Sequence, residues 1–176
     1  MRRPAVGDGI RLRPPLPADY PEMAAIIAAL IPRYLGRGLR EEAIAILREN
    51  TEAGAVGRKV AGFDASYVWS PAFVALAGSG RLLGFGAVRS DTHITQLHVI
   101  EEWHGRGIGH RLARALVAEI VRRHPRATEV TLSAASGALE AYMRMGFRPV
   151  GPRFDWHGIV AQPMSLPLRG PRCRLT

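Results

Sequence analysis

The amino-acid sequence predicts a single α+β domain, in which a mixed β-sheet is flanked by helices. Three observations lead to this prediction. The chain has 176 residues, a length that suits one domain with a sizeable core. Segments with strand composition alternate with helical segments along the chain. Residues 107–124 carry apolar side chains at every fourth position, which is typical of an amphipathic helix.

The domain is expected to cover residues 10–168, between an N-terminal tail at 1–9 and a C-terminal tail at 169–176. No internal repeat or low-complexity segment divides it. The chain is therefore expected to form one domain.

The N-terminal part is predicted to be mainly helical. A short strand at 9–13 stops at a pair of prolines, and a helix follows Asp19, a residue type that favours the N-cap position. A second helix is predicted at 41–50. Residues 51–71 contain three glycines and no clear period. So long a stretch without an element is either a functional loop, such as a lid over the site, or a misread element.

The strand signals are strongest in the middle of the chain. Residues 72–77 and 81–90 flank Gly78-Ser79-Gly80, a combination that predicts a β-hairpin. The remaining elements are predicted in this order: a strand at 92–100, the helix at 107–124, a buried strand at 129–134, a helix at 138–145 that ends at Gly146, and strands at 147–151 and 159–168.

The net charge of +9 raises the question of a nucleic-acid partner. Of the 24 basic residues only Lys59 is a lysine, and aromatic residues make up only 7% of the chain. Nucleic-acid platforms usually combine basic with aromatic side chains. The charge is therefore interpreted as a bias toward arginine that adds some affinity for polyanions, and a nucleic-acid partner is not expected.

The single cysteine, Cys173, excludes an internal disulfide framework and any site with several cysteine ligands, so no metal is expected. The densest apolar run, at 24–31, is too short to span a bilayer. These features favour a protein of the reducing cytoplasm that has no membrane partner.

The glycine-rich segment at 104–109 is the most informative part of the sequence. Gly105, Gly107 and Gly109 stand where a strand leads into the helix at 107–124. The first turn of a helix has backbone N–H groups without partners and the positive end of the helix dipole, which together bind anions. Glycines let a phosphate approach the main chain closely. Arg106 and Arg111 would add positive charge, so the segment predicts a diphosphate site.

Other glycine-rich motifs fit this segment less well. A dinucleotide fingerprint requires glycine at its first, third and sixth positions, and the sixth position counted from Gly105 is His110. A P-loop requires a Gly-Lys pair, and Lys59 lies elsewhere. A tight strand-to-helix connection without any ligand is the remaining alternative.

These residues resemble the GNAT acetyltransferase family. The segment from His104 to Gly109 is similar to the family's pyrophosphate loop, and it follows a strand that ends in the family's hydrophobic-x-Val pattern, here at 97–99. The second family motif matches Ala138, Tyr142 and the pair Gly146-Phe147. The sequence departs from the pattern at His104, where the family usually has Gln or Arg, and at Ala135, where it often has Asn.

The resemblance implies a mostly antiparallel sheet with a splayed fourth strand, and acetyl-CoA as the cofactor. It implies that the amine attacks the thioester directly and that Tyr142 protonates the departing thiolate. The alternative for Tyr142 is a core aromatic residue. The residues expected to bind the cofactor are Leu97, His98 and Val99 on the strand and His104, Gly105, Arg106, Gly107, Ile108, Gly109, His110 and Arg111 at the loop and helix start.

The general base is less well defined. His93 occupies the position of a carboxylate that family members often use, and His98 lies on the strand expected to splay. An imidazole titrates near neutral pH and can accept a proton directly or through water. Both histidines are candidates, and a route through water without one essential residue stays open.

The acceptor is expected to be a primary amine of a small molecule or of a protein. Two alternatives stay open: an acyl-CoA-binding module without catalysis, and an acetyltransferase for aminoacyl-tRNA, which only the charge suggests. The sequence also leaves open whether the protein forms a homodimer.

Overall fold

The computed structural model describes residues 9–29, 40–49, 51–63, 67–135 and 137–168. The C-terminal tail and residues 1–8 of the N-terminal tail lie outside the described residues. The helices are α1 Tyr20–Ala28, α3 Glu41–Glu49, α4 Ala53–Ala61, α5 Ile108–Arg123 and α6 Leu139–Arg144, with short 3-10 turns at Pro17–Asp19 and Glu101–Trp103. The strands are β1 Arg11–Arg13, β2 Ala72–Leu76, β3 Leu82–Arg89, β4 His93–Val99, β5 Glu129–Ala135, β6 Arg148–Pro149, β7 Phe154–Trp156 and β8 Ile159–Pro167.

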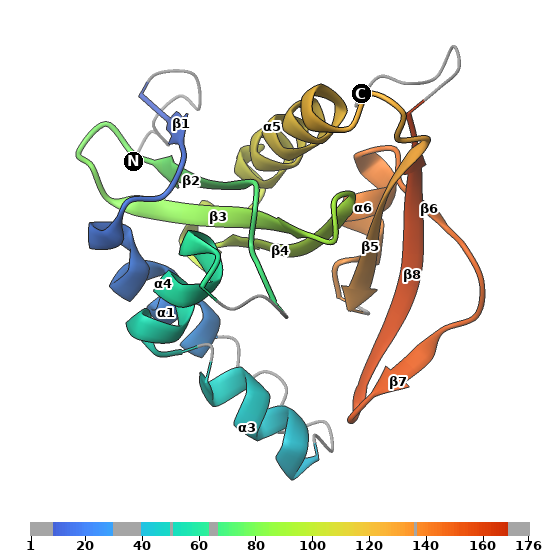
Figure 1. Ribbon diagram of the computed structural model, residues 1–176, viewed down its shortest axis with the longest axis horizontal. Coiled ribbons are helices and arrows are strands. Elements are labelled where there is room, and N and C mark those ends of the chain that lie inside the picture. The colour runs from blue at the N-terminus through green and yellow to red at the C-terminus, as the bar shows by residue number, and fades with distance from the viewer. Residues whose placement is uncertain (1–8, 30–39, 50, 64–66, 136, 169–176) are drawn as a thin grey trace.

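The strands form one mixed sheet in the order β1-β2-β3-β4-β5-β8-β6, with β7 paired to β8. All pairs are antiparallel except β4 with β5. The parallel pair joins only His93 to Thr131 and Ile94 to Leu132. Beyond these residues β4 and β5 diverge, so that the sheet opens into a V (Figure 1). The predicted α+β class and the splayed fourth strand are confirmed.

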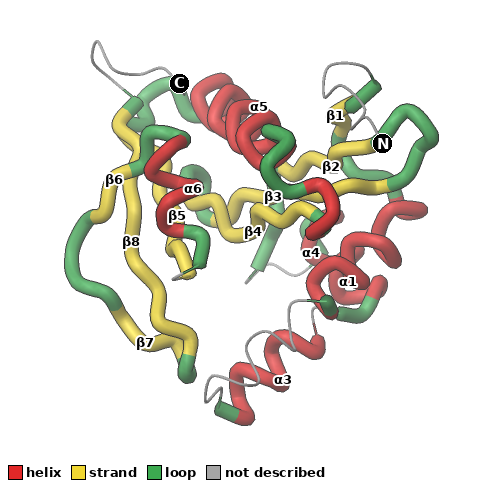
Figure 2. The backbone as a smooth tube through the Cα atoms, turned by 180° about the vertical axis from the view of Figure 1, so that it is seen from behind, coloured by secondary structure: helices red, strands yellow, loops and turns green. Residues whose placement is uncertain are grey.

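Helices cover both faces of the sheet (Figure 2). On one face, α5 buries Leu112, Leu116 and Ile120 against β2, β3, β4 and β5, and α6 packs into the same apolar layer. On the opposite face, α1 and α4 form a second core around Trp69 and Phe85. Within the described part of the chain, no helix combines the length and apolar composition needed to cross a membrane.

Residues 51–71 are not a structureless stretch, because α4 occupies 53–61. Its inward face is formed by Ala55, Val56 and the aliphatic part of Lys59, all buried. These side chains are too small or too polar to give a clear apolar period. The helix ends at Gly62, whose φ of +79° is the left-handed conformation favoured after a helix.

Two further predictions needed correction. The sequence predicts no strand between residues 151 and 159, but this stretch contains β7. This strand pairs with β8 through a two-residue turn at His157 and Gly158. Both turn residues have positive φ, as a two-residue hairpin turn requires, but a strand of three residues gives too short a pattern to recognise. Asp19 occupies the predicted N-cap position of α1, but its side chain makes no capping hydrogen bond. Its carboxylate instead accepts hydrogen bonds from Arg13, which lower its pKa, and from the Leu16 N–H.

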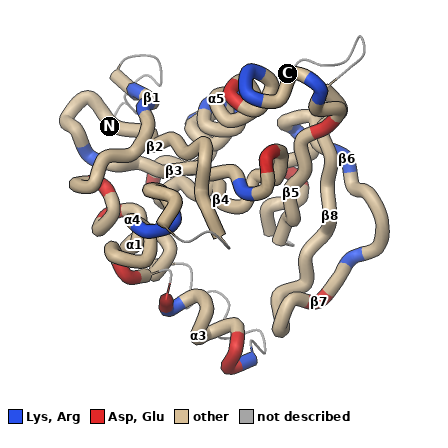
Figure 3. Tube along the Cα trace, in the orientation of Figure 1, with Lys and Arg blue, Asp and Glu red and all other residues tan. Residues whose placement is uncertain are grey.

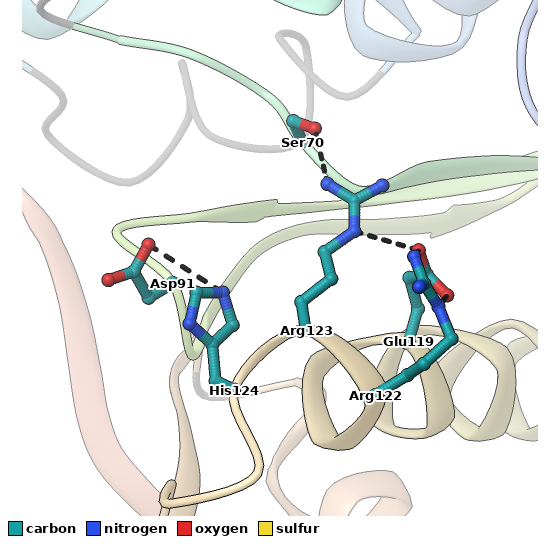
Figure 4. Close-up of polar contacts among 6 residues, drawn as sticks. All are labelled: Ser70, Asp91, Glu119, Arg122, Arg123 and His124. Carbon is teal, nitrogen blue, oxygen red and sulfur yellow. Dashed lines mark hydrogen bonds and ion pairs between the residues drawn. The ribbon is translucent and has the colours of Figure 1, made fainter.

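Polar contacts fasten the C-terminal end of α5 to the sheet (Figure 4). Arg123 donates hydrogen bonds to Glu119 and to the Ser70 hydroxyl at the start of β2. His124 Nε2 lies 3.7 Å from Asp91 Oδ1 in the β3–β4 turn. Because this end of α5 is held at the closed side of the V, its N-terminal end is directed toward the open side.

Candidate functional site

The open side of the V is bounded by the C-terminal half of β4. Leu97 and Val99 pack into the apolar layer under α5. On its other edge β4 lies very close to β3. A Cβ atom at position 84 would overlap the His98 carbonyl oxygen, so this close approach requires the glycine at Gly84. The edge that faces β5 has no strand partner after Ile94 within the described ranges. Figure 3 shows that β4 carries no charged residue, so this edge offers neutral main-chain groups to a ligand.

The loop after β4 presents its main chain openly. Gly105 and Gly107 have φ values of +72° and +75°, the left-handed region that favours glycine. A Cβ atom at either position would meet no heavy atom within 4 Å among the described residues. Gly107 is the N-cap of α5 and has no side chain to occupy the first N–H groups of the helix. The helix start therefore has open N–H groups and the positive end of a 16-residue helix.

The basic side chains around this loop contact the protein itself. His104 Nε2–H donates a 2.7 Å hydrogen bond to the carbonyl oxygen of Val99 and so ties the loop to the end of β4. The Arg106 guanidinium lies 4.6 Å from the ring centre of Trp103. These contacts hold the loop in place, so its open main chain is the feature that remains available to a ligand.

The other residues expected to bind the cofactor lie in the first turn of α5. Arg111 donates a 2.9 Å hydrogen bond to the carbonyl oxygen of Ile10, beside β1. Ile108 is fully buried and anchors the helix start in the core, whereas His110 is half-buried. The first turn of α5 is thus fixed by the buried Ile108 on the core side and by the Arg111 hydrogen bond beside β1.

The second motif lies beside the first. A Cβ atom at Gly109 would lie 3.6 Å from Met145 Cε, at the end of α6, and 3.8 Å from Val99 Cγ2. The start of α5, the end of β4 and α6 therefore meet at one point. Tyr142 of α6 is half-buried, and its ring lies edge-on to that of Phe147 at 6.1 Å. The structure thus brings the loop, the splayed strand and the tyrosine helix together.

The two candidate histidines lie on the face opposite α5. They are five positions apart, a spacing that would put them on opposite faces of a regular strand. The pairing with β3 skips Thr95, and this β-bulge turns both side chains to the same face. The His98 ring lies tilted against that of Phe85, with the ring centres 5.3 Å apart. His93 shares a 2.9 Å hydrogen bond with the Thr131 hydroxyl of β5.

Both imidazoles are neutral at pH 7. Burial lowers the pKa of His98 from 6.5 to about 4, and its Nε2–H donates to Gln96 Oε1 at 2.6 Å. Burial, and to a smaller extent the Arg89 guanidinium, also lowers the pKa of His93. His93 lies at the vertex of the V, where β4 and β5 separate, whereas Tyr142 lies on the α5 side.

Arg89 and Thr131 were not singled out from the sequence, although both adjoin His93. Arg89 is paired with His93 across β3 and β4, and Thr131 is paired with it across β4 and β5. A polar residue at a strand end gives no sequence signal by itself, and only the sheet register reveals these neighbours. Among the described residues, no group of three His, Cys, Asp or Glu side chains could hold a metal ion.

The model of the acetyltransferase (GNAT) domain family matches residues 70–168, which is more than half of the chain and contains the V, the loop and α6. No curated protein matches the chain with significance.

Solved structures share the fold over nearly the whole chain. A GCN5-related N-acetyltransferase from Rhodopseudomonas palustris is 23% identical, with a TM-score of 0.72, and the match covers 92% of this chain and 97% of that one. The PaiA N-acetyltransferase from Thermoplasma acidophilum, solved with coenzyme A, is 18% identical, with a TM-score of 0.66 and coverage of 90% and 98%. At these identities the structures establish the fold alone. The family model establishes the family: the chain belongs to the GNAT acetyltransferases.

Proposed function

We propose that this protein transfers the acetyl group of acetyl-CoA to a primary amine of a small molecule or a protein. The meeting of the open glycine loop, the unpaired edge of β4 and the Tyr142 helix carries this proposal. In the reaction, the amine nitrogen forms a bond to the acetyl carbon and the carbon–sulfur bond breaks. The amine loses a proton to a base, and the departing thiolate gains one.

In this proposal the main chain holds the cofactor. The N–H groups at 105–109 bind the pyrophosphate, with His104, Ile108, His110 and Arg111 shaping the loop and the helix start. The unpaired edge of β4 at 97–99 binds the pantetheine amides and the acetyl oxygen. The uncharged composition of β4 and its missing strand partner support this assignment. Cytoplasmic location and the oligomeric state stay predictions.

Tyr142 is our proposed general acid, because α6 adjoins both the loop and β4. His93 is our first candidate base and His98 the second. Both are neutral at pH 7 and on the face of the sheet opposite the acid. His93 has the better position, since it lies at the vertex of the V, where β4 and β5 separate.

Replacing Gly107 by valine tests the cofactor site. The branched side chain would stand where a phosphate must approach the N–H groups, so we expect the Kd for coenzyme A to rise at least about tenfold. The variant also carries the strain of a left-handed non-glycine residue, roughly 1–2 kcal/mol. Gly62→Val is the matched control, because Gly62 has a φ of +79°, is equally open and lies at the end of α4. Calorimetry showing unchanged affinity in folded Gly107→Val would refute the assignment.

Replacing Tyr142 by phenylalanine tests the acid. The ring and its contact with Phe147 are kept and only the hydroxyl is lost. General acids contribute ~10²–10⁴-fold, so we expect turnover, followed as free thiol release across an amine panel, to fall at least about tenfold. Coenzyme A affinity and Tm should hardly change. Tyr20→Phe, on the other face, is the control for loss of a tyrosine hydroxyl. Unchanged turnover, with chemistry limiting the rate, would make Tyr142 a core aromatic residue.

The pH profile tests the base. An amine acceptor is protonated below its own pKa, so log kcat/KM should rise with pH at a slope near one. A histidine base must be neutral, so the slope should steepen below the pKa of His93, which lies under 6.5. His93→Gln should lose this steepening and about 10²-fold in rate, whereas His98→Gln should retain it. A steep limb that survives in His93→Gln would transfer the role to another titrating group, with His98 as the second candidate.

A further inference from the structure

Two cationic side chains meet on one aromatic ring next to the vertex of the V. The Arg89 Cζ atom lies 4.6 Å from the ring centre of Tyr67, and Lys59 Nζ lies 5.4 Å from the same centre. Lys59 is buried, and its ammonium also lies 5.8 Å from the ring centre of Trp69. This cluster of Arg89, Lys59 and Tyr67 is hereafter called the cationic cluster.

The cationic cluster faces the side from which an acceptor must arrive. Val88 and Ile94 belong to the core under α5, so their neighbours Arg89 and His93 point to the opposite face. Tyr67 packs against the core that α1 and α4 form on that face. Because α5 and α6 pack on the other face, the cluster lies on the face of the vertex that these two helices do not cover.

The guanidinium of Arg89 is incompletely matched by the described residues. The Arg89 Nε is buried and has no hydrogen-bond partner among them. Lys59 is paired, with its Nζ 3.7 Å from Glu49 Oε1. Buried N–H groups in native proteins nearly always have a partner, so the Arg89 guanidinium is left with unused hydrogen-bonding capacity among the described residues.

Building on the proposed function, we propose that the cationic cluster binds a carboxylate of the acceptor, so that the substrate is an amine that also carries a carboxylate. An amino acid is the simplest member of this class. The flat guanidinium of Arg89 can hold a carboxylate through two parallel hydrogen bonds, which a lysine cannot do. The same positive field disfavours the ammonium form of the acceptor and so favours the neutral amine that attacks.

The first test compares acceptors with and without the carboxylate. Each L-amino acid and its amide is assayed with acetyl-CoA, and the ratio of kcat/KM for acid over amide is measured. We expect the parent enzyme to favour at least one acid by about tenfold or more, and Arg89→Gln to reduce that ratio by about 10–100-fold, as loss of a charge-assisted hydrogen bond does. Arg89→Lys, which keeps the charge and loses the fork, should lie between. Arg126→Gln, which removes an exposed charge after α5, should leave the ratio unchanged.

A second test does not depend on turnover. The ring signals of His93, the neighbour of Arg89, are followed by NMR while N-acetyl amino acids or their amides are added to the protein saturated with coenzyme A. The acids should shift these signals in the parent and in Arg126→Gln, the amides should not, and Arg89→Gln should abolish the shift.

The outcomes separate this inference from the proposed function. Shifts with the acids but no acetylation of any amine would contradict the proposed function and leave the carboxylate site standing. Acetylation of amides as fast as acids, or an acid preference that Arg89→Gln retains, would overturn the carboxylate site and leave the acetyltransferase standing. Absence of any acid-specific shift would also overturn it.

Discussion

The early separation of β4 from β5 is the constraint on which the rest of the site depends. Only two residue pairs join these strands. On its other edge β4 is fixed to β3, with Gly84 allowing the close approach, and on one face it is covered by α5. A main-chain edge is therefore left free inside a rigid frame. The glycine loop lies at one end of this edge and His93 at the other, and in the proposed reaction the cofactor and the acceptor meet along β4.

Much of this arrangement could be predicted from the sequence. The hairpin and α5 have strong local signals, a glycine turn and a four-residue apolar repeat, and local signals survive because the fold agrees with them. The two motifs indicated the loop and Tyr142, and the structure places Val99 and Met145 on either side of Gly109. The splay of β4 came from the family resemblance alone, since no single-strand pattern reports which neighbour a strand leaves.

The parts that could not be predicted depend on tertiary contacts. The helix α4 has an inward face of small residues and a lysine, so its apolar period in the sequence is weak. Its inward face can be recognised only from its packing against α1. The bulge at Thr95, which turns His93 and His98 to one face, exists only in the pairing with β3. The contacts of Arg89 with Tyr67 and His93 join residues from a loop and two strands, and no spacing in the chain indicates them.

Hydrogen exchange measured with and without coenzyme A tests most directly whether the free edge of β4 is the cofactor slot. Saturating coenzyme A should slow amide exchange at the end of β4, in residues that do not bond β3, and in the loop at 105–109. Exchange in the β2–β3 hairpin should stay unchanged, since those amides already have strand partners. Protection confined to other segments, or no change at β4 and the loop while the cofactor is bound, would contradict this account.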